Sequence, residues 1–279
     1  MRVGFLGPAG TFSHEALLSA GRRDAEPVAQ HTLHDAVLAV QEQEVDLALV
    51  PFENAIEGAV NPVLDALVFE APDVRIAGDL VHRVRHCLIA ADGLEMSAVR
   101  RVVSHPQATA QCARFLREEL GAVPVVAATS TAEAVRTVAA SGEPEAALGP
   151  RVAAELYDCS VLREGVEDDP DNVTRFVWLS RGGDARPEEE QGRAHKTALV
   201  FWGEGSSAPG WLVACLAEFA DRGVNLTRIE SRPLRRGLGN YLFLLELDGA
   251  ESAPPVATAI AGLRSHADVV RVLGSFPTG

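Results

Sequence analysis

The class of fold is decided at the start of the chain by residues 2–13, RVGFLGPAGTFS. The apolar run Arg2–Leu6 predicts a buried strand, and Gly7-Pro8 predicts a loop directly after it. Ser13 then fits the N-cap of a helix that we expect to run to Ala20. A buried strand that passes through a glycine-rich loop into a helix is the repeating unit of parallel α/β sheets.

The following residues repeat this alternation of strand and helix. Strands are expected at Gln30–Thr32 and Val45–Val50, and helices at Leu33–Glu42 and Asn61–Phe69. The order β-α-β-α-β-α predicts a parallel sheet. Residues 75–91 alternate apolar and polar side chains, and we expect them to form long strands that cross into a second lobe.

The second lobe is expected to repeat the pattern. Its strands are predicted at Arg101–Ser104, Val123–Ala127 and Ala146–Leu148, and its helices at Ala108–Leu120, Thr131–Ser141 and Arg151–Leu156. Strands at Val161–Leu162 and Arg175–Leu179 are expected to return to the first lobe. This gives two α/β lobes, residues 1–75 with 160–180 and residues 76–159, with a cleft for a small ligand between them.

A polar segment then predicts a domain boundary. Residues 181–195 (RGGDARPEEEQGRAH) are rich in glycine and charge, which is typical of a solvated linker. The elements expected beyond it are strands at Thr197–Trp202, Val224–Ser231, Tyr241–Leu247 and Val269–Leu273, and helices at Trp211–Arg222 and Pro255–His266. Their order, βαββαβ, is that of the ferredoxin-like motif. We therefore predict one domain over residues 1–180 and another over residues 196–279.

Composition narrows the kind of ligand. The chain has 279 residues, 47% of them hydrophobic, and a net charge of −14. Such a charge opposes non-specific binding to nucleic acid or to an anionic membrane surface, so an anionic substrate must be held by a local positive site. Four cysteines without a C-x-x-C pair indicate reduced thiols of a cytoplasmic protein, and no apolar run is long enough to span a membrane.

Four polar segments stand where strands are expected to end. They are Gly7–Ser13, Pro51–Gly58, Ser104–Gln107 and Asn172–Phe176. Together they offer hydroxyls, amides, backbone N–H groups and a cation, and ligands of open α/β sheets bind at the carboxyl ends of strands. Neither a metal-ligand cluster nor a trustworthy Ser/His/Asp arrangement is present. An enzyme of this kind is expected to work by positioning and hydrogen bonding.

Each segment also has a purely structural interpretation. The glycine-rich turn before Thr11 and Ser13 is either a tight connection or an anion-accepting helix start. Asn54 either stabilises a turn or donates to substrate oxygen. Ser104 fits the N-cap of a helix. That structural role does not account for Gln107. Arg175 forms either a structural ion pair or a bidentate contact with a carboxylate.

Taken together, the motifs resemble those of prephenate dehydratase with a C-terminal ACT regulatory domain. The matching segments are GPAGTFSHEA, VPFENAIEG, SHPQATAQC, DNVTRF and NLTRIESRP, in this order over residues 2–276. The resemblance implies a carbon-oxygen lyase that converts prephenate to phenylpyruvate in L-phenylalanine biosynthesis without a cofactor or metal. It also implies a two-lobed, periplasmic-binding-protein-like catalytic domain and a ferredoxin-like ACT domain that binds L-phenylalanine. The expected assembly is a cytoplasmic homodimer or homotetramer.

The resemblance also implies residue roles. Thr174 is expected to be the catalytic hydrogen-bond donor. The residues expected to bind substrate are Thr11, Ser13, Asn54, Ser104, Gln107, Asn172, Arg175 and Phe176. Those expected to bind the effector are Gly210, Leu212, Asn225, Leu226, Glu230, Ser231 and Arg232. Two positions depart from the family pattern: Ala55 replaces a hydroxyl residue, and the bulky Trp211 lies in the effector loop.

Three other functions stay open. Arogenate dehydratase performs the same chemistry on an amine-bearing substrate, and a non-aromatising prephenate decarboxylase is known among relatives. Outside enzymes, the same fold serves amino-acid-sensing binding proteins. Incubation with prephenate separates these functions by their products.

Overall fold

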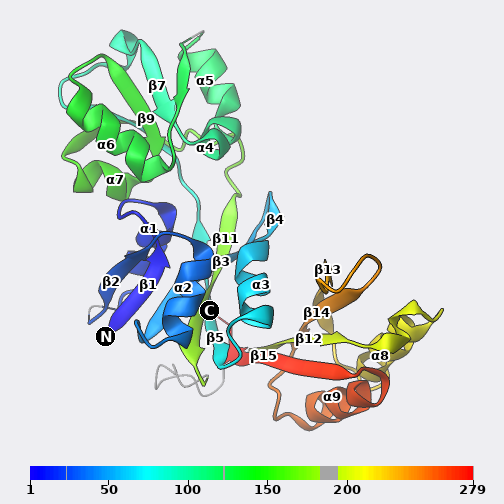
Figure 1. Ribbon diagram of the computed structural model, residues 1–279. Helices are drawn as coiled ribbons and strands as arrows, with labels where there is room; N and C mark the ends of the chain where they lie inside the picture. Colours follow the sequence, from blue (N-terminus) through cyan, green and yellow to red (C-terminus); the bar gives the residue numbers. More distant parts are fainter. Residues whose placement is uncertain (23, 122, 183–193, 279) are drawn as a thin grey trace. The chain divides into compact units, whose positions relative to one another are not determined.

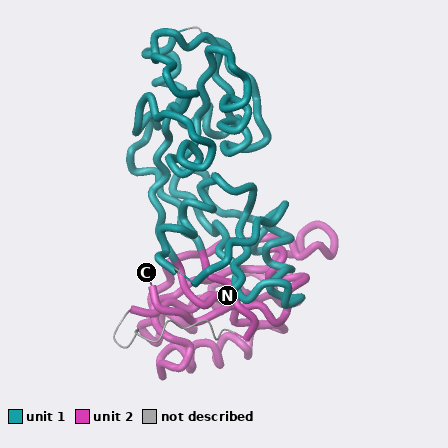
Figure 2. The backbone as a smooth tube through the Cα atoms, turned by 90° about the vertical axis from the view of Figure 1, so that its left-hand side faces the viewer, with its two compact units in different colours: residues 1–64, 80–176 teal, residues 65–79, 177–279 magenta. Residues whose placement is uncertain are grey.

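A computed structural model of the protein describes residues 1–22, 24–121, 123–182 and 194–278. The chain divides into two compact units, one of residues 1–64 and 80–176 and the other of residues 65–79 and 177–279 (Figure 2). Three sheets with associated helices make up the described fold (Figure 1), which confirms the predicted α/β class.

The first sheet has six strands in the order β2-β1-β3-β11-β5, with β4 beside β3. Its strands are β1 (Arg2–Leu6), β2 (Glu26–Gln30), β3 (Leu47–Asn54), β4 (Gly58–Ala59), β5 (Val74–Arg83) and β11 (Val173–Arg181). The helices of this region are α1 (Phe12–Ser19), α2 (Leu33–Gln41) and α3 (Asn61–Phe69). Strand β1 pairs in parallel with both β2 and β3, as the alternation of strand and helix predicts.

The start of α1 corrects one expectation. Thr11, rather than Ser13, is the N-cap of this helix, because its Oγ1 accepts the His14 amide at 3.4 Å. The same hydroxyl donates to the Leu6 carbonyl at 3.0 Å, so the helix start is tied to the end of β1. Ser13 lies buried in the first turn of α1.

The second sheet has five strands in the order β10-β6-β9-β7-β8. They are β6 (Cys87–Ala91), β7 (Arg101–Ser104), β8 (Val125–Ala127), β9 (Glu145–Gly149) and β10 (Cys159–Glu164). The helices here are α4 (Pro106–Gln111), α5 (Ala113–Glu119), α6 (Thr131–Ser141) and α7 (Arg151–Leu156), and a 3₁₀ turn covers Met96–Ala98. Alternate strand residues face opposite sides, so two apolar clusters form, one with α4 and α5 and one with α6 and α7.

Two expectations for this region are wrong. The strand predicted at Val161–Leu162 does not return to the first sheet, because β10 pairs antiparallel with β6 as an edge of the second sheet. The helix predicted over Ala108–Leu120 is broken at Cys112, whose φ of −119° and ψ of 20° are not helical. The N-cap of α4 is His105 rather than Ser104, and His105 Nδ1 accepts the Gln107 amide at 3.3 Å.

The third sheet has four antiparallel strands in the order β13-β14-β12-β15. They are β12 (His195–Trp202), β13 (Leu226–Pro233), β14 (Tyr241–Asp248) and β15 (Val269–Pro277). With α8 (Trp211–Ala220) and α9 (Pro254–His266), they follow the predicted order β-α-β-β-α-β, and a 3₁₀ turn covers Glu204–Ser207. One apolar cluster joins this sheet to both helices.

The predicted linker is only partly within the described residues, because residues 183–193 lie outside them. Its two ends belong to strands, since Arg181 ends β11 and His195 begins β12. Among the helices that the structure describes, none combines the length and the apolar character needed to cross a bilayer.

Candidate active site

Three predicted site residues meet where β3 ends and β11 begins. Asn54 Nδ2 donates to Thr174 Oγ1 at 2.9 Å and to Asn172 Oδ1 at 2.8 Å. All three side chains are buried. The neighbouring backbone joins the same two segments, because the Ala55 amide donates to the Val173 carbonyl at 2.9 Å. The structure therefore brings together residues that the sequence separates widely.

The oxygen of the Asn54 side chain fixes the orientation of the side-chain amide. Asn54 Oδ1 accepts the backbone N–H groups of Ile56 and Glu57, both at 3.0 Å. This is the turn that the structural interpretation of Asn54 predicts. Because the oxygen is engaged in the loop, the NH₂ group must face Thr174, where it contacts an acceptor lone pair of the hydroxyl. The hydroxyl proton of Thr174 can then be directed to another acceptor.

Arg175 follows Thr174 on β11. Its Nε lies 3.7 Å from Glu53 Oε2, and its guanidinium carbon lies 5.5 Å from the centre of the Phe52 ring. Phe52 and Glu53 both belong to β3, the strand that carries Asn54. Most of the Arg175 side chain is shielded, with 13% exposed. The arrangement holds the guanidinium close to the amide and hydroxyl group just described.

A further polar group connects the loop after β3 to helix α4. Gln107 Nε2 and Gln111 Nε2 both donate to Glu57 Oε1, at 2.6 and 2.9 Å. Gln107 was predicted from the sequence, whereas Glu57 and Gln111 were missed. The signal was present, because Gln107 and Gln111 are four residues apart and so share one face of the helix.

The remaining predicted substrate residues hold structural positions. Ser104 is fully buried and donates to the His105 carbonyl at 3.1 Å. Thr11 caps α1, and Ser13 is buried in that helix. Phe176 is buried and contacts the His82 ring edge-on, with centroids 6.3 Å apart. For these four residues a contact with substrate stays a prediction.

The predicted effector residues lie at the start of α8 and along β13. Gly210 precedes α8 with a positive φ of 83°, and Leu212 and Leu226 pack against the apolar cluster of the third sheet. Asn225 Nδ2 donates to Asp248 Oδ2 at 2.8 Å, and Glu230 Oε2 accepts from Arg228 at 2.8 Å.

The end of β13 carries the other two effector residues. Arg232 pairs with Asp65 at 2.9 Å, and Ser231 is exposed. Trp211 has its own fixed place, because its Nε1 donates to the His266 carbonyl at 2.7 Å and its ring packs beside Phe201 and Phe243. Effector binding by this set stays a prediction.

Burial alters the chemistry of several groups. It raises the pKa of the Cys87 and Cys215 thiols to about 11 and also raises that of Cys112, so these cysteines stay protonated at neutral pH. Burial lowers the pKa of His14 and of His86. Within the described ranges, no group of three or more His, Cys, Asp or Glu side chains is arranged to hold a metal ion.

Comparison with known proteins agrees with this description. The prephenate dehydratase family model matches residues 3–184. The chain is 38% identical over 275 residues to a prephenate dehydratase of Amycolatopsis methanolica, which covers 99% of this chain and 88% of that protein. It is 35% identical over 283 residues to the prephenate dehydratase of Bacillus subtilis strain 168, covering 99% and 98%.

Two solved structures are similar over nearly the whole chain. A prephenate dehydratase from Arthrobacter aurescens in complex with L-Phe has a TM-score of 0.88 at 37% identity, covering 99% of this chain and 90% of that one. A protein described as GqqA, a novel type of quorum quenching acylase, has a TM-score of 0.88 at 33% identity, covering 100% and 98%. These likenesses define an α/β enzyme. More particularly, the chain belongs to the prephenate dehydratase family.

Proposed function

We propose that the protein converts prephenate to phenylpyruvate in L-phenylalanine biosynthesis. The bond between the ring and its carboxylate breaks, CO₂ leaves, and the electron pair enters the ring. The ring then expels its hydroxyl group, which takes up one proton and departs as water. Since a C–O bond is broken without hydrolysis, the enzyme is a carbon-oxygen lyase. The observation that carries the proposal is the buried Thr174 hydroxyl, which accepts from Asn54 Nδ2 at 2.9 Å.

Thr174 is proposed to donate to the departing hydroxyl. Negative charge develops on that oxygen only as the C–O bond breaks, so a positioned donor stabilises the transition state more than bound prephenate. A threonine hydroxyl is a weak acid, which makes hydrogen bonding its natural contribution. Asn54 supports it by occupying a lone pair of Oγ1, so the hydroxyl proton is turned away from Asn54.

Arg175 is proposed to bind one carboxylate of prephenate. A guanidinium presents two parallel N–H groups that match a carboxylate. Glu53 lies 3.7 Å from Arg175 Nε and helps to orient the group, although the same contact also fits the structural interpretation. The substrate contacts predicted for Thr11, Ser13, Ser104, Gln107, Asn172 and Phe176 are part of the same proposal.

Incubation of the purified protein with prephenate tests the function directly. Phenylpyruvate, followed by its absorbance, is the expected product. A dihydro product would identify the non-aromatising decarboxylase. A higher kcat/KM with arogenate would identify the arogenate enzyme, and no turnover of either compound would favour the sensor.

The acylase relative provides one further candidate. An acylase needs a nucleophile whose proton is taken up by a neighbouring base. The group that contacts Thr174 Oγ1 is an amide NH₂, which donates a proton and cannot accept one. This arrangement favours the lyase. Release of a free amine from an N-acyl amide, without phenylpyruvate formation from prephenate, would favour the acylase instead.

We also propose that residues 196–279 are an ACT regulatory domain of ferredoxin-like fold, and that residues 1–180 are a two-lobed catalytic domain. The β-α-β-β-α-β order and the antiparallel sheet support the first assignment. The Arthrobacter aurescens relative was solved with L-Phe and covers 99% of this chain, which supports L-phenylalanine as the effector. A cytoplasmic homodimer or homotetramer completes the proposal, and free cysteines among the described residues are consistent with that compartment.

Calorimetry with L-phenylalanine tests the regulatory assignment. We expect binding, together with inhibition of prephenate turnover. Trp211→Phe is a gentler probe of the effector loop than Trp211→Ala, because it keeps a ring beside Phe201 and Phe243 while it removes the bond to His266. If neither the wild type nor Trp211→Phe shows heat of L-phenylalanine binding or inhibition, residues 196–279 serve in assembly and not in regulation.

A further inference from the structure

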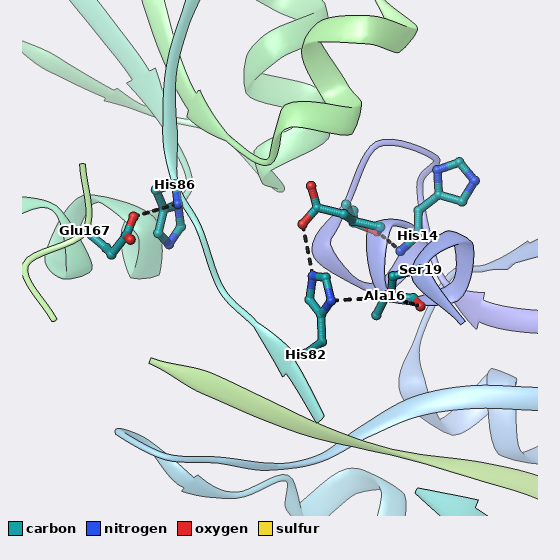
Figure 3. A network of polar contacts seen from close by, with 8 residues as sticks. His14, Ala16, Ser19, His82, His86 and Glu167 are labelled. Atoms are coloured by element: carbon teal, nitrogen blue, oxygen red, sulfur yellow. Dashed lines mark hydrogen bonds and ion pairs between the residues drawn. The ribbon is translucent and has the colours of Figure 1, made fainter. Parts of the chain in front are cut away.

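His86 is a buried histidine that the site described above does not use. It lies directly before β6 and is 1% exposed. Its backbone amide donates to Glu167 Oε2 at 2.9 Å (Figure 3). Its backbone carbonyl accepts the Val166 amide at 3.1 Å. Phe12 packs edge-on against the imidazole, with centroids 4.8 Å apart. The ring therefore has a fixed position.

The contacts of the ring determine its tautomer. Gln111 Nε2 donates to the Glu57 carboxylate, which only accepts, so Gln111 Oε1 must face the other way. That oxygen lies 2.9 Å from His86 Nε2, which therefore carries the proton. His86 Nδ1 is buried and has no hydrogen-bond partner within the described part of the chain. Burial also lowers the pKa of His86, which favours the neutral ring.

Hydrogen bonds connect this ring to Thr174 through Gln111, Glu57 and Asn54, and at Glu57 the connection passes from the side-chain carboxylate to the backbone N–H through covalent bonds. His86 orients Gln111, and Gln111 and Gln107 together hold the carboxylate of Glu57. The Glu57 amide donates to Asn54 Oδ1 at 3.0 Å, and Asn54 Nδ2 donates to Thr174 Oγ1. The side-chain amides of Gln111 and Asn54 each have one orientation, because their oxygen faces a donor and their NH₂ group faces an acceptor.

We infer that His86 is a positioning residue, whose Nε2–H orients Thr174 through Gln111, Glu57 and Asn54. The inference rests on the proposed role of Thr174 as the hydrogen-bond donor to the departing hydroxyl. His86 itself does not touch the substrate. Its loss lets the Gln111 amide rotate and loosens the loop that carries Asn54, so the hydroxyl spends less time in the reactive orientation.

Two near-isosteric variants test this without a large cavity. The amide nitrogen of His86→Gln can reach the place of Nε2, whereas that of His86→Asn falls near the place of Nδ1. We expect His86→Asn to lower kcat by about tenfold or more with KM within about twofold, and His86→Gln to recover most of the loss. Equal kcat in the two variants overturns the inference, as does a loss confined to KM. Thermal unfolding of both variants separates this effect from lost stability.

A double-mutant cycle tests the route through Gln111. In a Gln111→Ala background the connection is already broken, so His86→Asn should lower kcat further by less than about twofold. The same tenfold loss in both backgrounds would mean that His86 acts independently of Gln111, which contradicts the inference.

One readout does not depend on activity. In ¹⁵N-histidine NMR spectra, the wild-type signal that is missing from His86→Gln belongs to His86. At neutral pH its chemical shifts should be those of the neutral Nε2–H tautomer. An Nδ1–H tautomer or an imidazolium would overturn the inference even if prephenate turns over normally. Absence of prephenate turnover in the wild type, with the Nε2–H tautomer observed, would contradict the proposed function and leave the hydrogen-bond series in place.

Discussion

Thr174 depends on Asn54, a partner 120 positions earlier in the chain. The sequence predicted both residues, because each lies within a polar motif beside a strand. It did not predict their contact, nor that Glu57 and Gln111 continue the same series of hydrogen bonds. Such a network depends on how strands and loops meet in three dimensions. Local spacing reveals only the shared face of Gln107 and Gln111.

Replacement of Thr174 should separate catalysis from binding. We expect Thr174→Ala to lower kcat by roughly 10²- to 10⁴-fold with KM nearly unchanged, because the lost donor acts in the transition state. Thr174→Ser keeps the hydroxyl and is the matched control, with most of the activity retained. Steady-state kinetics with prephenate give both constants. A raised KM with normal kcat in the alanine variant would contradict the assigned role.

Arg175 is tested by a substitution that keeps its charge. Lysine cannot make a planar bidentate contact with a carboxylate, so Arg175→Lys should raise KM for prephenate by about tenfold or more. Unfolding temperature should change little, since the partner Glu53 is 42% exposed at its side chain and such pairs contribute little. The opposite pattern, unchanged KM with a lower melting temperature, would make Arg175 a structural ion-pair residue.

Three helices have the bounds that the sequence predicts, and for α6 local signals mark both ends, the Ser130 N-cap and the left-handed Gly142. The bounds of α3 and α7 agree with the sequence-based prediction at both ends, and those of α6 do as well. The break between α4 and α5 was missed for a physical reason. Asp168 accepts the Arg114 amide at 3.0 and 3.1 Å, so a carboxylate 54 positions away caps the start of α5. No local pattern contains that information.

Strand β10 was placed in the wrong sheet because a short apolar run does not specify its partner. Cys159 pairs with Ala91 in an antiparallel register that includes an irregularity between Val161 and Arg163. The pattern shows that a strand exists, and only the tertiary structure shows which edge it joins.

The end of α3 allows a test within the second compact unit. Arg271 donates to four carbonyls, those of Leu67, Val68, Ala71 and Pro72, at 2.8 to 3.3 Å. These include carbonyls that a helix end leaves without intrahelical partners. Arg271→Met should lower the free energy of unfolding by about 1–3 kcal/mol, since carbonyls in three partly buried contacts and one exposed contact lose a charged donor.

Arg271→Lys is the control for charge alone. An ammonium group is a compact donor that cannot span the same four oxygens, so its free energy of unfolding should lie between wild type and Arg271→Met. Urea denaturation measures all three proteins. Equal stability of wild type and the methionine variant would show that the contacts with α3 contribute nothing.

The three-sheet organisation followed from the alternation of apolar runs and glycine-rich breaks, because these patterns extend over long parts of the chain. The assignment of each group to a function required the family resemblance and the comparisons. Neither the family resemblance nor the comparisons assigned a role to His86, since a single histidine before an apolar strand carries no signal in the sequence. Its significance depends on contacts with Gln111 and Glu167, which belong to other segments.

Stability of the protein should fall on the acid side of neutrality. Burial lowers the pKa of His14 and His86 from the ordinary value of 6.5, and for His86 it outweighs the Gln111 hydrogen bond and the charges of Glu167 and Glu15, which act in the opposite direction. Below pH 6.5 the unfolded chain therefore binds protons that the folded chain does not. The contribution of these two histidines to the free energy of unfolding is therefore complete above pH 6.5 and is lost as pH falls below it.

Thermal unfolding at about pH 7.5 and about pH 5.5 measures this effect, with a lower melting temperature expected at the acid value. In His86→Gln one of the two proton-linked groups is gone, so the melting temperature should fall less between the two conditions. His31→Gln, at an exposed histidine, is the control and should keep the wild-type dependence. An equal fall in wild type and His86→Gln would show that His86 is not linked to folding through its proton.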